Sequence, residues 1–226
     1  MAVFTVRDVE GMRQLRIDIA DESVRSVRGA LSHMEGRIRI TAAVPGPGAI
    51  LRSMISGEAR VRPRYTGTGS IHLRPSLRGY HVFEARDLRW ILEPGVFWAA
   101  EGEVRLGVRM EKIIPSLWAG DGLFNFQTTV EGDGLVAINA PGPVEEIDLK
   151  DSEVLVKGRL VLARTEGLRF TVRRPGGFFR SRIAGEPLAR SYRGTGKALV
   201  CWTPFWNQYM HDMIAPERSP SQSLYE

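Results

Sequence analysis

The stretch Glu35-Gly36-Arg37-Ile38-Arg39-Ile40-Thr41 begins a pattern that returns twice more, at a spacing of about 65 residues. In each copy a Glu-Gly pair precedes an alternating run, a small residue with Gly and an acid follows, and a Gly-x-Gly pair closes the unit. The closing pairs are Gly67-Thr68-Gly69, Gly132-Asp133-Gly134 and Gly194-Thr195-Gly196. A fixed period of this kind is typical of one supersecondary unit copied along a chain, so we expect three similar units.

Within the units, polar and apolar residues alternate with a period of two, as in residues 15–19, 37–40 and 168–172. This period is typical of strands with one face in the core and one in water. Gly- and Pro-rich turns separate the runs at short intervals. We therefore predict an all-β fold with strands that include residues 37–41, 103–108, 123–128, 135–139 and 168–173.

The Gly-x-Gly pairs are interpreted as hairpin turns between such strands, because glycine supplies the positive φ that tight turns require. One small antiparallel unit cannot bury its apolar face alone. The pattern thus predicts three tandem β-sandwich or β-prism-like repeats, at about 15–83, 84–147 and 148–206, around a pseudo-threefold axis. Residues 1–206 would form a single domain, followed by a partly disordered tail at 207–226.

Composition narrows the function classes without selecting one. The chain has 226 residues, 43% of them hydrophobic, which is enough for a core. Its net charge of +5 permits an anionic partner but does not require one. Cys201 is the single cysteine, so no intramolecular disulfide can form. No run reaches the roughly 18 apolar residues of a membrane helix, and we expect a cytoplasmic protein without a membrane span.

Three short motifs stand in a distinctive order in the second unit and its sequel: Gly120-Asp121-Gly122-Leu123-Phe124, Gly132-Asp133-Gly134-Leu135-Val136, and Pro141-Gly142-Pro143 with the residues to 149. Their order and spacing resemble the "altered inheritance of mitochondria" family of the twenty-fourth type, formerly a domain of unknown function. The resemblance spans about residues 13–204. It implies an all-β fold like that of the tryptophan RNA-binding attenuation protein. It implies no established reaction, and mitochondrial members look like structural or assembly factors.

Acidic residues occupy corresponding turns of the three units. Glu58, Asp121 and Glu186 could converge on the pseudo-threefold axis and bind a cation or an amine. The competing interpretation, which we favour, is that they accept backbone N–H bonds in their own turns. The Glu residues of the three Glu-Gly pairs have the same two interpretations.

Arginine is the most prominent polar feature of the first unit. Arg60, Arg62 and Arg64 alternate and would project from one strand face, with Arg74 across the next connection. Arginines of this kind can grip phosphates, which makes nucleic-acid binding an alternative function. An ordinary solvated face explains the same residues, and no RNA-binding signature accompanies them.

Sites for metals, cofactors and catalysis are not indicated. The four histidines show no metal-ligand spacing, and His72 is expected on the exposed face of an alternating strand. No phosphate loop, dinucleotide fingerprint or nucleophile elbow is present. The sequence thus predicts no enzyme activity, no cofactor and no metal site.

The end of the chain is aromatic, and its side chains would either cover the core or form a subunit interface. These residues are Trp202, Phe205, Trp206 and Tyr209. Together with the repeat, they favour a non-enzymatic binding or scaffold protein that acts through a protein partner or self-association as a homo-oligomer. RNA binding through the Arg-rich face is the alternative.

Overall fold

The computed structural model describes residues 1–42, 62–76, 79–110, 126–156, 158–173 and 189–202. Every regular element in these ranges is a β-strand, which confirms the all-β expectation. No helix of the described chain is long and apolar enough to cross a membrane. The strands are β1 (Val3–Val9), β2 (Met12–Ser26), β3 (Leu31–Thr41), β4 (Arg64–Leu73), β5 (Tyr80–Glu84), β6 (Trp90–Leu92), β7 (Phe97–Glu101), β8 (Arg105–Met110), β9 (Phe126–Glu131), β10 (Leu135–Asn139), β11 (Val144–Val156), β12 (Val161–Thr165), β13 (Leu168–Arg173) and β14 (Ala189–Cys201).

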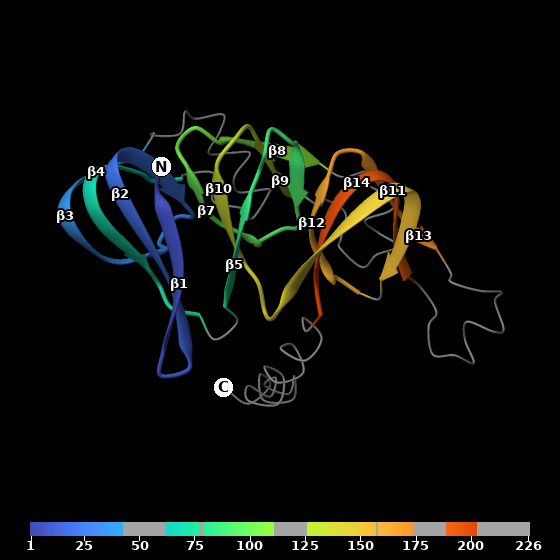
Figure 1. The fold of residues 1–226 in the computed structure, drawn as a ribbon, viewed down its shortest axis with the longest axis horizontal. Coiled ribbons are helices and arrows are strands. Elements are labelled where there is room, and N and C mark those ends of the chain that lie inside the picture. The colour runs from blue at the N-terminus through green and yellow to red at the C-terminus, as the bar shows by residue number, and fades with distance from the viewer. Residues whose placement is uncertain (43–61, 77–78, 111–125, 157, 174–188, 203–226) are drawn as a thin grey trace, which may run out of the picture.

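These strands form two antiparallel sheets (Figure 1). The first sheet has the order β3-β4-β2-β7-β10-β5, and β1 pairs with β2 beside that path. The second has the order β11-β14-β12-β6-β9-β8, and β13 pairs with β14. Strands β1 to β4 lie at one end of the elongated molecule and β11 to β14 at the other, with the middle strands between them (Figure 1).

The middle of the chain contributes to both sheets. Strands β5, β7 and β10 belong to the first sheet, whereas β6, β8 and β9 belong to the second. The chain therefore passes from one sheet to the other between β5 and β6, back to β7, on to β8 and β9, and back to β10. Two of these passages fall at positions of the sequence repeat: Gly102 belongs to the second Glu-Gly pair, and residues 132–134 are the second Gly-x-Gly pair.

The interpretation of the Gly-x-Gly pairs as hairpin turns is wrong. Gly67 and Gly69 lie inside β4, the third pair lies inside β14, and the second pair joins β9 of one sheet to β10 of the other. Positive φ is still required, at 125° for Gly67 and 150° for Gly69. A Cβ on Gly69 would be 2.0 Å from the carbonyl oxygen of Glu35 on the paired strand. Glycine is thus needed because two bent, paired strands approach closely, and not because the chain reverses.

The largest core cluster lies where the two sheets meet. Trp90 of β6, Leu162 of β12 and Leu199 of β14 come from the second sheet, and Val136 and Ile138 of β10 come from the first. Separate clusters fill the two ends, one around β2 and β4 and one around β11 and β14. Burial of apolar surface between the sheets therefore fixes the middle strands, whose ends line the site described next.

Candidate functional site: an acidic cleft

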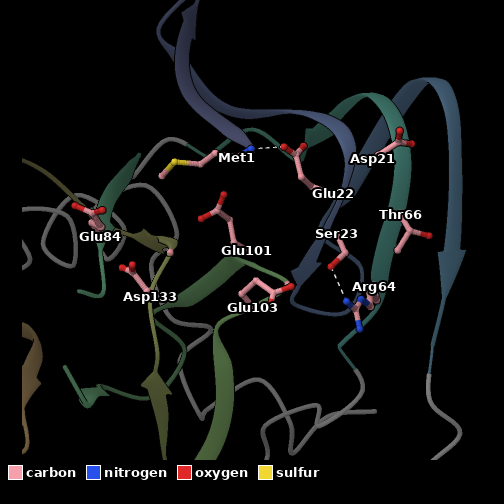
Figure 2. Close-up of a pocket in the computed structure, with 12 residues that line it drawn as sticks. Met1, Asp21, Glu22, Ser23, Arg64, Thr66, Glu84, Glu101, Glu103 and Asp133 are labelled. Carbon is pink, nitrogen blue, oxygen red and sulfur yellow. Dashed lines mark hydrogen bonds and ion pairs between the residues drawn. The ribbon is translucent and has the colours of Figure 1, made fainter. Parts of the chain in front are cut away.

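A cleft of about 630 Å³ opens beside the first sheet, and we call it the acidic cleft (Figure 2). Glu84 and Asp133 lie on one side, Glu22, Ser23 and Arg64 on the other, and Glu101 and Glu103 between them (Figure 2). Six of its side chains are carboxylates that come from distant parts of the chain: Asp21, Glu22, Glu84, Glu101, Glu103 and Asp133.

A β-bulge in β2 brings acids to the rim of the acidic cleft. The register of β2 against β4 shifts between Ala20 and Glu22, and the intervening Asp21 has a φ of 65°. Asp tolerates this left-handed conformation better than most residues. Glu22 then turns back and accepts a hydrogen bond of 2.6 Å from the Ala20 backbone N–H. The bulge thus places two consecutive acids at one edge of the cleft, as bulges often do next to functional sites.

Glu101 forms the buried floor of the cleft. Glu101 is only 8% exposed, and both of its carboxylate oxygens accept hydrogen bonds from backbone N–H groups. The donors are Ala2 at 2.9 Å and Leu135 at 2.7 Å. The neighbouring glycines permit this position, because a Cβ on Gly134 would lie 2.8 Å from Oε2 of Glu101. A Cβ on Gly102 would lie 1.7 Å from Oγ of Ser23. The repeat glycines of the middle unit therefore shape the floor.

Two cationic groups offset part of the negative charge. Arg64 donates to Oγ of Ser23 at 2.7 Å, and the ammonium group of Met1 pairs with Glu22. The Ala20 N–H and then this ammonium hold the pKa of Glu22 below its usual value. With six carboxylates against two cations, the cleft attracts positively charged ligands.

The predicted arginine face is only partly assembled. Arg62 donates to Oγ1 of Thr128 on β9 at 2.9 Å, and its guanidinium lies 4.9 Å from the ring centroid of Phe97. Arg64 instead reaches β2 and lines the acidic cleft. Arg74 is exposed beyond the end of β4, and Arg60 lies outside the described residues. The structure therefore brings Arg64 to the cleft and directs Arg62 between the sheets.

The predicted acidic turn residues Glu58, Asp121 and Glu186 lie outside the described residues, as do Phe205, Trp206 and Tyr209. Trp202 is described and is 62% exposed, with its Nε1 donating to Glu145 at 3.1 Å. This indole does not cover the core, and its role in an interface stays a prediction.

Two kinds of residue were missed or misplaced by sequence reasoning. The cleft acids come from four separate segments of the chain, so no local motif marks them. The sequence signals for them were Glu101 in its Glu-Gly pair and Asp133 between two glycines. Glu101 does accept backbone N–H groups, although from distant residues and not from its own turn. The expectation that His72 is exposed is wrong, since it is 4% exposed. Its ring is covered by the stacked ring of His33 from the neighbouring strand.

A second concavity, of about 570 Å³, crosses β11, β13 and β14, and we call it the basic groove. Arg169 of β13 lies directly opposite Arg193 of β14, and Arg173 lines the same groove. Glu153 accepts hydrogen bonds from Arg173 and from Ser191. Like charges directly opposite each other on paired strands are destabilising, and Glu153, which lies opposite Arg193 on β11, offsets part of this repulsion.

Comparisons with known proteins agree with the fold. Protein SPYM3_0169 from Streptococcus pyogenes, known from an X-ray crystal structure, is similar to this chain with a TM-score of 0.69 and 22% sequence identity. The match covers 95% of this chain and 99% of that chain, and at this identity it shows the fold alone. None of the curated proteins is similar enough to this chain to count as a match. The family model described as "Mitochondrial biogenesis AIM24" matches residues 4–201. Because that match spans most of its length, the chain belongs to the AIM24 family.

Proposed function

We propose that this protein is a non-enzymatic binding or scaffold protein, and that its acidic cleft holds a basic segment of a partner protein. The observation that carries the proposal is the excess of carboxylates in one concave site of about 630 Å³. Lys and Arg side chains entering this site would meet several carboxylates at once. The family description, mitochondrial biogenesis, supports a role in assembly, because it names no reaction.

The floor and rim of the cleft suit rigid-body binding. Glu101 is fixed by two backbone hydrogen bonds and Arg64 by Ser23, so little side-chain entropy is lost when a ligand arrives. Glu103 is exposed at the rim and free to meet a partner without first leaving a buried position. We expect electrostatic steering to set the association rate of such a partner and its dependence on salt.

The test is binding of a fluorescein-labelled peptide of alternating Lys and Gly, measured by anisotropy at low and high salt. We expect the double variant Glu103→Lys with Asp133→Lys to weaken binding at least about ten-fold at low salt. Asp148→Lys, an exposed charge reversal on β11 outside the cleft, is the matched control and should leave affinity unchanged. Equal affinity for the double variant and the native chain, or turnover of any substrate that a single point substitution abolishes, would contradict the proposal.

We also propose that the chain consists of three copies of one unit around a pseudo-threefold axis. Support comes from two corresponding close approaches of the repeat glycines. A Cβ on Gly36 would be 2.6 Å from the Thr68 carbonyl oxygen, and one on Gly167 would be 2.2 Å from the Thr195 carbonyl oxygen. In both cases the glycine of the Glu-Gly pair approaches the middle residue of the Gly-x-Gly pair, although Gly36 lies within β3 and Gly167 lies in the turn before β13.

Self-association is proposed through β3, which forms an outer edge of the first sheet. This strand has 11 residues, and its Met34 and Ile40 are 40% and 42% exposed. Open edge strands of this length are templates for pairing with another chain. Light scattering should report more than one chain per particle, and fewer for Ile40→Lys. A cytoplasmic location stays a prediction from composition.

A second candidate function, RNA binding through an Arg-rich strand face, is favoured by the basic groove. Its facing pair Arg169 and Arg193 offers two guanidinium groups to one phosphate chain. Affinity for a labelled single-stranded RNA should fall steeply with salt, because phosphate contacts release counterions. Arg193→Glu should weaken it, while Arg39→Glu on β3 should weaken it far less. RNA retention that does not respond to salt would exclude this function.

A further inference from the structure

Two histidines and a glutamate meet on one face of the β3–β4 pair. His33 lies directly opposite His72 in the strand register, and Glu35 follows two residues after His33. Residues two apart on a strand share a face, so all three side chains project to the same side. One ligand atom from each of the three residues lies within 4.8 Å of the other two.

Within the described part of the chain, Nδ1 of His33 lies 3.1 Å from Oγ of Ser32, whereas one nitrogen of the paired His72 has no partner. The two rings are stacked, with centroids 4.2 Å apart and an interplanar angle of 9°. His72 is 4% exposed, and its Nδ1 is buried with no hydrogen-bond partner among the described residues. Buried polar atoms without partners are rare and costly in native proteins, and they often point to a missing ion or water.

We propose that His33, Glu35 and His72 bind a divalent transition-metal ion of the zinc class. Two imidazole nitrogens and one carboxylate oxygen are a ligand set typical of zinc. Ligands about 2.1 Å from a tetrahedral ion are about 3.4 Å apart, so atoms up to 4.8 Å apart have to close by up to about 1.4 Å. His33 also has to rotate out of its stack on His72, because two parallel rings cannot both point a nitrogen lone pair at one ion. His33 and Glu35 are exposed and can make that movement. The fourth coordination position then opens toward solvent.

Nearby charges set the expected strength of the site. Arg16 of β2 lies opposite His72 in the strand register, and both Arg16 and Arg7 act on the imidazole electrostatically. Asp18 offsets Arg16 through an ion pair of 2.9 Å and is also hydrogen-bonded by Ser70. Glu35 adds the negative charge that a divalent cation needs. The surrounding arginines make the site weaker than a fully acidic one, which suits an exchangeable ion.

The site is independent of the acidic cleft, since none of its three residues lines that cleft. The test therefore uses full-length protein without a histidine tag, stripped with a chelator and dialysed. Calorimetric titration with zinc chloride should show one equivalent bound. His33→Ala and Glu35→Gln should each weaken binding at least about ten-fold. His81→Ala, a histidine of β5 outside the cluster, is the matched control and should bind like the native chain.

A second readout separates this site from adventitious zinc. Cobalt bound by the trio should give the intense visible absorption of a tetrahedral ion, and His33→Ala should abolish it. Both test residues are exposed, so the variants should keep the native circular dichroism spectrum. Absence of saturable zinc binding, or binding that survives both His33→Ala and Glu35→Gln, would overturn the proposal.

Discussion

Gly69 and Gly29 both have positive φ, at 150° and 73°, yet they differ in what a side chain would meet. A Cβ on Gly69 would lie 2.0 Å from the Glu35 carbonyl oxygen, whereas a Cβ on Gly29 meets nothing within 4 Å. The first position combines backbone strain with a steric clash against a hydrogen-bonded strand, and the second carries strain alone. Two glycines with positive φ should therefore differ in how much stability is lost when each is replaced.

We expect Gly69→Ala to lower the free energy of unfolding by about 3 kcal/mol or more, because either β3 or β4 has to shift. Gly29→Ala should cost about 1 kcal/mol, from the conformation alone. Urea unfolding followed by circular dichroism measures both values. Equal losses for the two variants would show that the close approach of β3 and β4 does not require glycine.

The ionisation of Glu153 makes the stability of the fold depend on pH in the acid range. The hydrogen bond from Ser191, followed by the contact with Arg173, holds the pKa of Glu153 below its usual value of 4.5. Because the carboxylate is favoured in the folded state, its contribution to stability is complete above pH 4.5. That contribution disappears as the pH falls through the lower folded-state pKa.

Glu153→Gln should therefore be less stable than the native chain at pH 7, and the difference should shrink by about pH 3. Urea midpoints at the two pH values measure the effect. Asp148→Asn, an exposed acid on the same strand, should show no such convergence. A stability difference that stays constant with pH would show that the loss comes from packing and not from the charge.

At the scale of elements, the alternation of polar and apolar residues located individual strands well. The predicted strands at 135–139 and 168–173 coincide with β10 and β13. The passages between sheets were not predicted, because the glycine letters that mark a turn also mark a bend in a paired strand. Glu101 shows the same limit at the site: its Glu-Gly pair was visible in the sequence, but its partners Ala2 and Leu135 are distant along the chain.

Glu101 ties the end of β7 to the start of β10 and to Ala2. Glu101→Ala leaves two backbone N–H groups without their partner, and we expect it to cost about 3 kcal/mol of unfolding free energy. The neighbouring exposed acid provides the control, since Glu103→Ala should change stability by less than about 0.5 kcal/mol. Chemical denaturation checks both. If both variants lose equally little stability, Glu101 contributes charge to the cleft but its hydrogen bonds do not stabilise the contact between β7 and β10.

At the scale of the molecule, the two sheets share the largest of the three core clusters. Trp90 is 1% exposed, its Nε1 donates to the Ala85 carbonyl at 3.1 Å, and its ring lies 4.9 Å from that of Phe83. The overall all-β class followed from the sequence because alternation is a local property. The joining of the sheets did not, because it depends on which apolar faces meet in space.

Trp90→Ala should lower the free energy of unfolding by about 4 kcal/mol, since it leaves a large cavity between the sheets. The exposed Trp202 is the matched control, and Trp202→Ala should cost less than about 0.5 kcal/mol. Fluorescence and circular dichroism should report one shared transition for each variant. Two separate transitions in Trp90→Ala would indicate that the sheets unfold independently.

The passage of residues 80–139 back and forth between the sheets also has a mechanical consequence. Each sheet contains strands of this segment, so neither half of the chain holds a complete sheet of its own. Separating the two sheets would therefore require the strands of this segment to leave one sheet or the other, so mechanical unfolding of the two sheets is expected to be coupled.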